Sequence, residues 1–128
     1  MKAEIHTSAI GVALYRIKCN GSLHGRWTVA NTKEDPHGSS DGEMGIEIAT
    51  PLKREKKSLA GLYKVDIYLN DKNIFSGKLR IESLQKDSYQ LFWMKDSVVL
   101  YKGYGVRRKR TLAANYWKID QKKHTPES

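Results

Sequence analysis

The sequence predicts an all-β protein, a single antiparallel up-and-down β-barrel of about eight strands. First, aromatic and β-branched residues recur at every second position in short segments, and turn residues separate each segment from the next. Second, no segment has a convincing helical periodicity. Third, glycines inside the expected strands favour a closed barrel over a two-sheet sandwich, because they permit sharp coiling or close backbone approach. These glycines are Gly25, Gly77, Gly103 and Gly105.

The first two strands are expected over residues 10–18 and 23–30. Each alternates between an apolar and a polar face, as a strand with one buried side does. The apolar faces contain Ala13, Tyr15 and Ile17 in the first strand, and Leu23, Gly25, Trp27 and Val29 in the second. Asn20-Gly21 lies between them and predicts a hairpin turn of type I′, which needs positive φ at both central residues.

A polar loop over residues 31–42 is expected to be the longest connection, and a third strand follows over residues 43–50. This strand carries Met44, Ile46 and Ile48 on one side. Pro51 is expected to end it, because proline cannot donate a hydrogen bond to the ladder. After a basic loop over residues 53–57, the fourth strand is expected over residues 61–69. Its apolar face contains Tyr63, Val65, Ile67 and Leu69.

The remaining four strands are expected over residues 74–82, 88–95, 98–106 and 111–119. The first of these has the clearest alternation, with Phe75, Gly77, Leu79 and Ile81 on one face. Connections are expected at residues 70–73, 85–87, 96–97 and 107–110. The strands form one domain spanning residues 1–128, with its core over about residues 10–119 and a polar tail over residues 120–128.

The composition is that of a single soluble globular domain of 128 residues. No apolar run approaches the roughly 18 residues that a membrane-spanning helix needs. No N-terminal segment resembles a signal peptide, so a cytoplasmic location is expected, although an exported form that had already been trimmed would look the same. The single Cys19 cannot form an internal disulfide and gives no support for an oxidising compartment.

The net charge of +9 is concentrated in residues 53–57 (+3), 107–110 (+4) and 118–123 (+2). Successive turns of an up-and-down barrel alternate between its ends, so the first two clusters are expected at one rim. That rim is a candidate site for nucleic acid or an acidic protein, while solubility and edge protection are the competing explanation. The residues of this basic rim are Lys53, Arg54, Lys56, Lys57, Arg107, Arg108, Lys109 and Arg110.

Two short motifs connect the chain with known barrels. Gly25-Arg26-Trp27 resembles the Gly-x-Trp signature of lipocalins, although lipocalins carry it on their first barrel strand and here a strand precedes it. The run 101–105 (Tyr-Lys-Gly-Tyr-Gly), with Leu112-Ala113-Ala114, is similar to later strands of avidin-like barrels and of some uncharacterised bacterial barrel proteins. The chain therefore resembles the calycin group of small barrels. This resemblance implies a central cavity as the default binding site and names no ligand.

Six aromatic residues are expected on the inner faces of the strands, namely Trp27, Tyr63, Phe75, Tyr89, Trp93 and Tyr101. Such rings line ligand pockets and also pack solid cores, so a cavity and a filled barrel both remain open. The predicted function is non-enzymatic binding of a small apolar or aromatic ligand inside the barrel. The alternative is a basic interaction module that contacts nucleic acid or an acidic protein through the basic rim.

No catalytic or cofactor motif is present. The histidines His6, His24, His37 and His124 form no pattern with Cys19 or a serine. Asp35, His37, Asp41 and Glu43 are chemically suitable metal ligands, but their spacing fits no EF-hand and a solvated loop is the favoured interpretation. We therefore expect no enzymatic activity, no metal and no cofactor.

Overall fold

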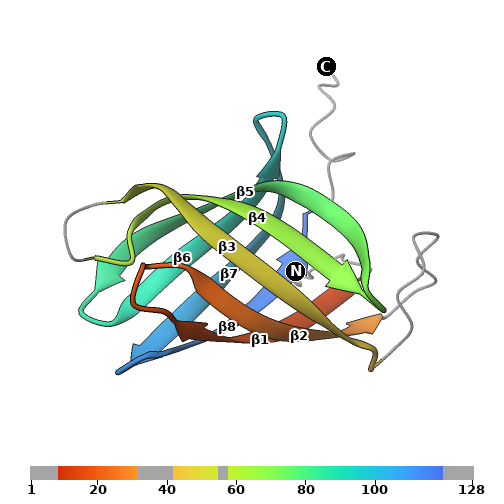
Figure 1. Cartoon of the computed structure of the whole chain (residues 1–128), viewed down its shortest axis with the longest axis horizontal. Coiled ribbons are helices and arrows are strands. Elements are labelled where there is room, and N and C mark those ends of the chain that lie inside the picture. The colour runs from red at the N-terminus through yellow and green to blue at the C-terminus, as the bar shows by residue number, and fades with distance from the viewer. Residues whose placement is uncertain (1–8, 32–41, 55–57, 120–128) are drawn as a thin grey trace, which may run out of the picture.

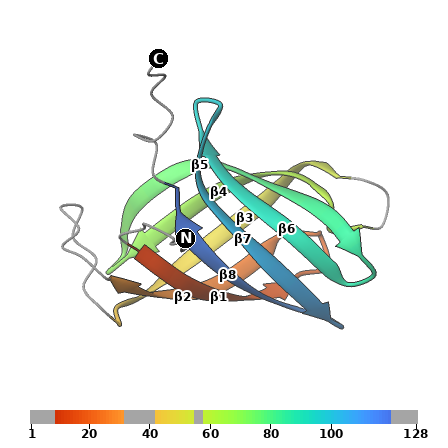
Figure 2. The ribbon, with the colours of Figure 1, turned by 180° about the vertical axis from the view of Figure 1, so that it is seen from behind.

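The computed structural model describes residues 9–31, 42–54 and 58–119. Within these ranges eight β-strands form one closed barrel, and each strand lies beside its neighbours in the sequence (Figure 1). All pairings are antiparallel, and β1 pairs with β8 to complete the ring. Figure 2 shows β6, β7 and β8 on the side that is turned away in Figure 1. The predicted all-β, up-and-down barrel is confirmed. No helix in the described part of the chain has the length and apolarity to cross a bilayer.

All the predicted strands are present. They are β1 (Ala9–Ile17), β2 (Leu23–Asn31), β3 (Met44–Arg54), β4 (Gly61–Leu69), β5 (Lys72–Gln85), β6 (Ser88–Lys95), β7 (Val98–Arg108) and β8 (Thr111–Lys118). The connection between β4 and β5 is shorter than predicted, because it uses only Asn70 and Asp71. Both residues have positive φ, 53° and 65°, as a type I′ turn requires. The backbone twist of a type I′ turn matches the right-handed twist of the strands on either side, so β5 begins directly after Asp71.

The type I′ turn predicted at Asn20-Gly21 is wrong. Only Gly21 in this connection has positive φ, at 88°. Gly21 N donates to Lys18 O (2.9 Å), and Lys18 N donates to Ser22 O (2.9 Å), so three residues separate the closing pair. The Asn20 side-chain oxygen accepts a hydrogen bond from Ser22 N at 2.9 Å. Asn20 therefore shapes the turn through its side chain, and Gly21 alone supplies the left-handed conformation.

The expectation that Pro51 ends the third strand is also wrong. The strand β3 continues to Arg54, and its register against β4 shifts between Pro51 and Lys53. Pro51 lies opposite Tyr63, and the register shift leaves Leu52, the next residue, without a partner on β4. The strand therefore continues past the proline with a bulge directly after it.

The inward face of β3 differs from its apolar face in the sequence. Met44 and Ile46 are 57% and 45% exposed and face outward, whereas Gly45, Glu47 and Ala49 face the interior. The pairing with β2 explains this orientation: Trp27 lies opposite Gly45, and Leu23 lies opposite Ala49. Small residues on β3 thus make room for large side chains on β2, which satisfies close packing of the interior.

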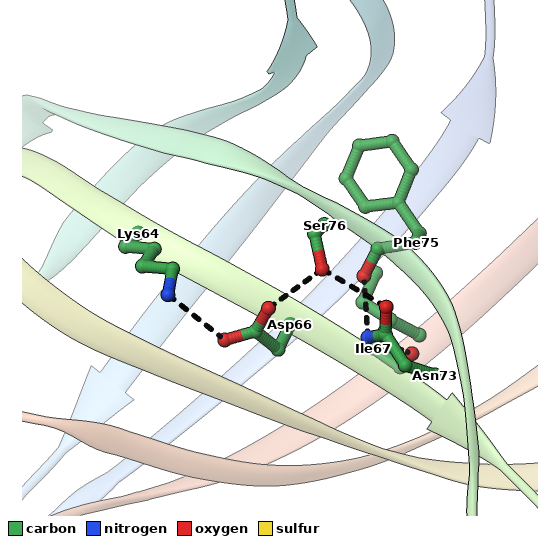
Figure 3. A network of polar contacts seen from close by, with 6 residues as sticks. All are labelled: Lys64, Asp66, Ile67, Asn73, Phe75 and Ser76. Atoms are coloured by element: carbon green, nitrogen blue, oxygen red, sulfur yellow. Dashed lines mark hydrogen bonds and ion pairs between the residues drawn. The ribbon is translucent and has the colours of Figure 1, made fainter.

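A polar network joins the outer faces of β4 and β5 (Figure 3). The Ser76 hydroxyl donates to Asp66 Oδ1 at 2.7 Å, and Lys64 Nζ lies 3.9 Å from Asp66 Oδ2. Asn73 Nδ2 donates to the carbonyl oxygens of Ile67 and Phe75 at 3.2 and 3.1 Å. These bonds span the register shift between Ile67 and Tyr68. They hold the strand ends that carry Ile67 and Phe75 into the barrel.

Candidate functional site: a carboxylate among aromatic rings

The central feature of the barrel interior is Glu47 on β3. Its side chain is only 2% exposed, and it is the one acidic or basic side chain that is buried among the described residues. Gly25 on β2 and Ile67 on β4 are its neighbours across the sheet. Neither neighbour supplies a polar side chain, so the partners of the carboxyl group come from across the barrel.

Two polar groups approach the Glu47 carboxyl group from other strands. Trp93 Nε1 on β6 donates a hydrogen bond to Glu47 Oε2 at 2.9 Å. The Tyr15 hydroxyl on β1 is buried without a hydrogen-bond partner among the described residues. It nevertheless lies near enough to Glu47 for the carboxylate to add to the effect of burial, and both raise the Tyr15 pKa well above its usual value. An unpartnered buried hydroxyl is unusual and costs stability.

Burial raises the pKa of Glu47 to about 7, against opposing effects of the Trp93 hydrogen bond and of the nearby Tyr15 hydroxyl, which is close to Glu47 without meeting hydrogen-bond geometry. The side chain is therefore divided between its neutral and charged forms near neutral pH. A carboxyl group poised in this way, inside a barrel, marks a candidate functional site.

Three aromatic rings form a wall beside the carboxyl group. The ring centroids of Trp93 and Tyr116 are 5.7 Å apart, and those of Tyr101 and Tyr116 are 6.0 Å apart. The Tyr116 hydroxyl donates to Thr28 O at 3.1 Å. Burial, followed by the charges of Glu47 and Tyr101, raises the pKa of Tyr116, so the ring stays neutral at physiological pH. We call Tyr15, Glu47, Trp93, Tyr101 and Tyr116 the interior cluster.

Glycine allows two of these tyrosines to reach across a neighbouring strand. A Cβ atom at Gly25 would overlap the ring of Tyr15, and one at Gly11 would overlap the ring of Tyr116. Tyr15 on β1 therefore lies over β2 and extends toward Glu47 on β3. Tyr116 on β8 likewise lies over β1 and reaches the backbone of β2. The glycines of the inner wall thus position the rings of the cluster.

The two ends of the barrel differ in how well their interior residues are covered. At the end that contains the β3–β4 connection, Leu59 is 1% exposed and accepts a hydrogen bond from the Tyr63 hydroxyl at 2.8 Å. We call this the Leu59 end. At the opposite end five inward side chains are only partly buried; they are Ile67, Leu69, Phe75, Tyr101 and Tyr116. We call this the Tyr116 end.

All the aromatic residues predicted to line a cavity lie on inward-facing positions. Trp27, Tyr63, Tyr89 and Trp93 are buried, and Phe75 and Tyr101 are partly buried against the core. Of the six, Trp93 and Tyr101 belong to the interior cluster. Glu47 was not predicted as a site residue, because Met44, Ile46 and Ile48 make the other side of β3 the apolar one in the sequence. The small residues Gly45 and Ala49 on either side of Glu47 were the available signal.

The described part of the basic rim, Lys53 and residues 107–110, lies at the Leu59 end, since β3 ends there and the β7–β8 turn joins its strands there. Arg108, Lys109 and Arg110 are exposed, and Arg107 Nε donates to Lys109 O at 2.8 Å. Arg110 lies 3.6 Å from Cys19 Sγ, and its guanidinium lowers the pKa of that exposed thiol. The side chain of Arg54 and both Lys56 and Lys57 lie outside the part of the structure that is described.

Residues with potential catalytic or metal chemistry do not gather elsewhere in the described structure. Within residues 9–31, 42–54 and 58–119, no three His, Cys, Asp or Glu side chains are placed to hold a metal ion. His24 is exposed on the outer face of β2. The other histidines, with Asp35 and Asp41, fall outside the described residues.

A second concave feature lies on the outer wall. It is an open groove of about 560 Å³ across β1, β2, β7 and β8 and the first residue of β3. Val12, Leu14, Met44, Tyr104 and Val106 line it, and each is roughly half exposed. Arg26 is its one basic lining residue. No contact in the structure identifies what covers this groove, so the interior cluster remains the better-defined site.

No known protein family, curated protein or solved structure matches this chain. The function is therefore inferred from the geometry of the barrel.

Proposed function

We propose that this protein is a calycin-like, non-enzymatic binding protein that holds a small organic molecule inside the barrel at the interior cluster. The observation that carries this proposal is the buried carboxyl group of Glu47 beside an unpartnered Tyr15 hydroxyl. A barrel built only as a packed core gains nothing from these groups, because a buried carboxyl group with one neutral donor and a buried hydroxyl without a partner both cost free energy. A bound ligand supplies the missing partner, and the half-buried rings at the Tyr116 end give it a route.

The indole N–H signals of the tryptophans test this proposal by NMR. Trp27 and Trp93 face the interior, whereas Trp117 lies on the outer wall with its ring 5.8 Å from Tyr104. A library of small aromatic and aliphatic molecules is added to ¹⁵N-labelled protein, and Trp93→Phe assigns the Trp93 signal. We expect a binder to shift the Trp93 signal in a saturable way and to leave Trp117 unchanged. Shifts confined to Trp117 place binding on the outer wall and contradict the proposal.

The second candidate function is polyanion binding by the basic rim. It is favoured by the exposure of Arg108, Lys109 and Arg110 on one turn, beside the turn that carries Lys18. Charge-driven binding of nucleic acid weakens steeply with salt, because bound cations are released. Replacing residues 107–110 with serine should therefore reduce both the affinity for RNA and its salt dependence. Equal binding by the variant removes this candidate.

A further inference from the structure

The buried carboxyl group of Glu47 has no buried side chain of opposite charge beside it. No Lys, Arg or His side chain is buried among the described residues. Trp93 donates one neutral hydrogen bond to one carboxylate oxygen. A carboxylate removed from water normally has a cation beside it or takes up a proton. Its pKa of about 7 means that the proton is lost from a large fraction of molecules at physiological pH. A positive charge is therefore the group that this site lacks.

The surroundings of Glu47 suit an organic cation better than a metal ion. A metal ion needs several hard or borderline ligands, and the described residues contain no group of three or more. Aromatic faces attract ammonium groups, and Trp is the strongest of the three aromatic residues in this respect. The rings of Trp93, Tyr101 and Tyr116 lie together beside the carboxyl group. An anion would meet Glu47 with like charge, and a neutral apolar molecule would leave the carboxylate uncompensated.

We propose that the ligand of the barrel is an organic ammonium ion whose charged nitrogen pairs with Glu47 while its carbon skeleton lies against Trp93, Tyr101 and Tyr116. This inference rests on the proposed function, because it names the ligand class of the same site. The Tyr15 hydroxyl oxygen, which has no hydrogen-bond partner in the described part of the chain, accepts a second hydrogen bond from the ammonium group. Since the side chains close over Glu47, the half-buried rings of Tyr101 and Tyr116 rotate outward to admit the ligand.

Binding of an ammonium ion is expected to strengthen as pH rises. The titratable groups whose pKa the charge of Glu47 raises are Tyr15 on β1 and Tyr116 on β8, so neither ionises below pH 8; Tyr101 on β7 is the other titratable group of the cluster. An alkylammonium group has a pKa near about 10, as lysine does, and stays charged in the same range. Only Glu47 then changes charge between pH 5.5 and 8 at this site, because its pKa is about 7. Affinity should rise as its proton is lost.

The test uses three probes with one skeleton and different charges: 2-phenylethylamine, 2-phenylethanol and 3-phenylpropionate. Each is titrated at pH 7.5 into the wild-type chain and into Glu47→Gln, with the Trp93 indole N–H signal as the readout. We expect the amine to bind the wild type at least about tenfold more tightly than the alcohol, and the carboxylate to bind most weakly. In Glu47→Gln the amine should fall to the affinity of the alcohol, while the alcohol changes by less than about twofold.

The outcomes separate this inference from the function on which it rests. If the alcohol binds at Trp93 as tightly as the amine, or if Glu47→Gln leaves amine binding intact, the barrel binds ligands but the ammonium inference is wrong. If none of the probes shifts Trp93 while members of the library do, the ammonium inference is wrong and the proposed function stands; if neither the probes nor the library shift it, both are wrong. Should Glu47→Gln fail to fold, the wild-type pH profile decides the question. Amine affinity that does not rise between pH 5.5 and 8, relative to the alcohol, overturns the inference.

Discussion

The two halves of the barrel interior contain different chemistry. Toward the Leu59 end, buried aliphatic residues fill the interior, and they include Leu23, Leu59, Ile81 and Leu112. Toward the Tyr116 end, the interior holds a carboxyl group, an unpartnered hydroxyl and rings that remain partly exposed. The first half has the composition of a stabilising core, and the second bears the energetic cost that binding sites commonly carry. We infer that stability is concentrated in one half and binding in the other.

The largest expected effect tests whether Leu59 belongs to the core. Its side chain is buried although it lies in the connection between β3 and β4. Leu59→Ala should lower the free energy of unfolding by about 3 kcal/mol, because it removes apolar contact and leaves a cavity. Leu69→Ala at the Tyr116 end is the matched control, and its partly buried side chain should contribute about 1 kcal/mol. Urea unfolding measures both, and equal losses would contradict the contrast between the halves.

An effect of similar size is expected from the pH dependence of Glu47. Its pKa is about 7 in the folded protein and 4.5 in the unfolded chain, so the folded state binds more protons between these values. Stability therefore falls as pH rises from 4.5 to 7, by up to about 3 kcal/mol from this group. Glu47→Gln keeps an oxygen acceptor for Trp93 and removes the titration.

The measurement for Glu47 is the difference in unfolding free energy between the wild type and Glu47→Gln across this pH range. Other acidic groups titrate equally in both proteins, so the difference isolates Glu47. The variant should gain stability relative to the wild type as pH rises. A difference that stays constant between pH 5 and 8 would show that Glu47 has an ordinary pKa.

A smaller effect is expected from the hydrogen bond that holds Leu59 in place. Tyr63→Phe removes the donor to Leu59 O and leaves that buried carbonyl unpaired, which should cost about 1 to 2 kcal/mol. Tyr89→Phe is the control, because its ring is also buried but its hydroxyl is not the donor to Leu59 O. Denaturant unfolding compares the two variants. A larger loss in Tyr89→Phe would argue against a specific role for the Leu59 contact.

The smallest effect concerns the surface of the Leu59 end. Arg110 beside Cys19 lowers the pKa of the thiol and so increases its thiolate fraction. Arg110→Gln should slow alkylation of Cys19 by iodoacetamide at pH 7.5 by about two- to threefold. Lys109→Gln on the same turn is the control and should leave the rate unchanged. Equal slowing by both variants would indicate a general effect of surface charge instead of the specific contact.

The fold was predictable because its signals are local. Alternation and turn residues lie within each hairpin, and the Asp96-Ser97 turn, with φ values of 52° and 70°, is as tight as expected. Two local predictions were wrong, the type I′ turn at Asn20-Gly21 and the end of the third strand at Pro51. Both depend on features that the alternation of apolar and polar residues does not contain. Asn20 bonds to Ser22 through its side chain, and the bulge after Pro51 preserves a strand that proline was expected to end.

The interior cluster could be predicted only in part, because it assembles from strands far apart in the sequence. Trp93 and Tyr101 were expected to face inward from their own alternation. Glu47 was not, since Met44 and Ile46 make the other side of β3 the apolar one in the sequence. Its true orientation follows from the fit of Trp27 over Gly45, which is a contact between strands. No pattern within one strand contains that information.

Closure of the sheet also limits how other proteins can bind to this one. In the described barrel every strand has a hydrogen-bonded neighbour on both sides, including β1 and β8. A peptide therefore finds no free strand on which to add itself by β-augmentation, and another copy finds no template for amyloid-like growth. The outer wall can thus carry half-exposed apolar side chains, such as Val12 and Leu14, without promoting aggregation by strand addition. Any partner must recognise the barrel through its side chains.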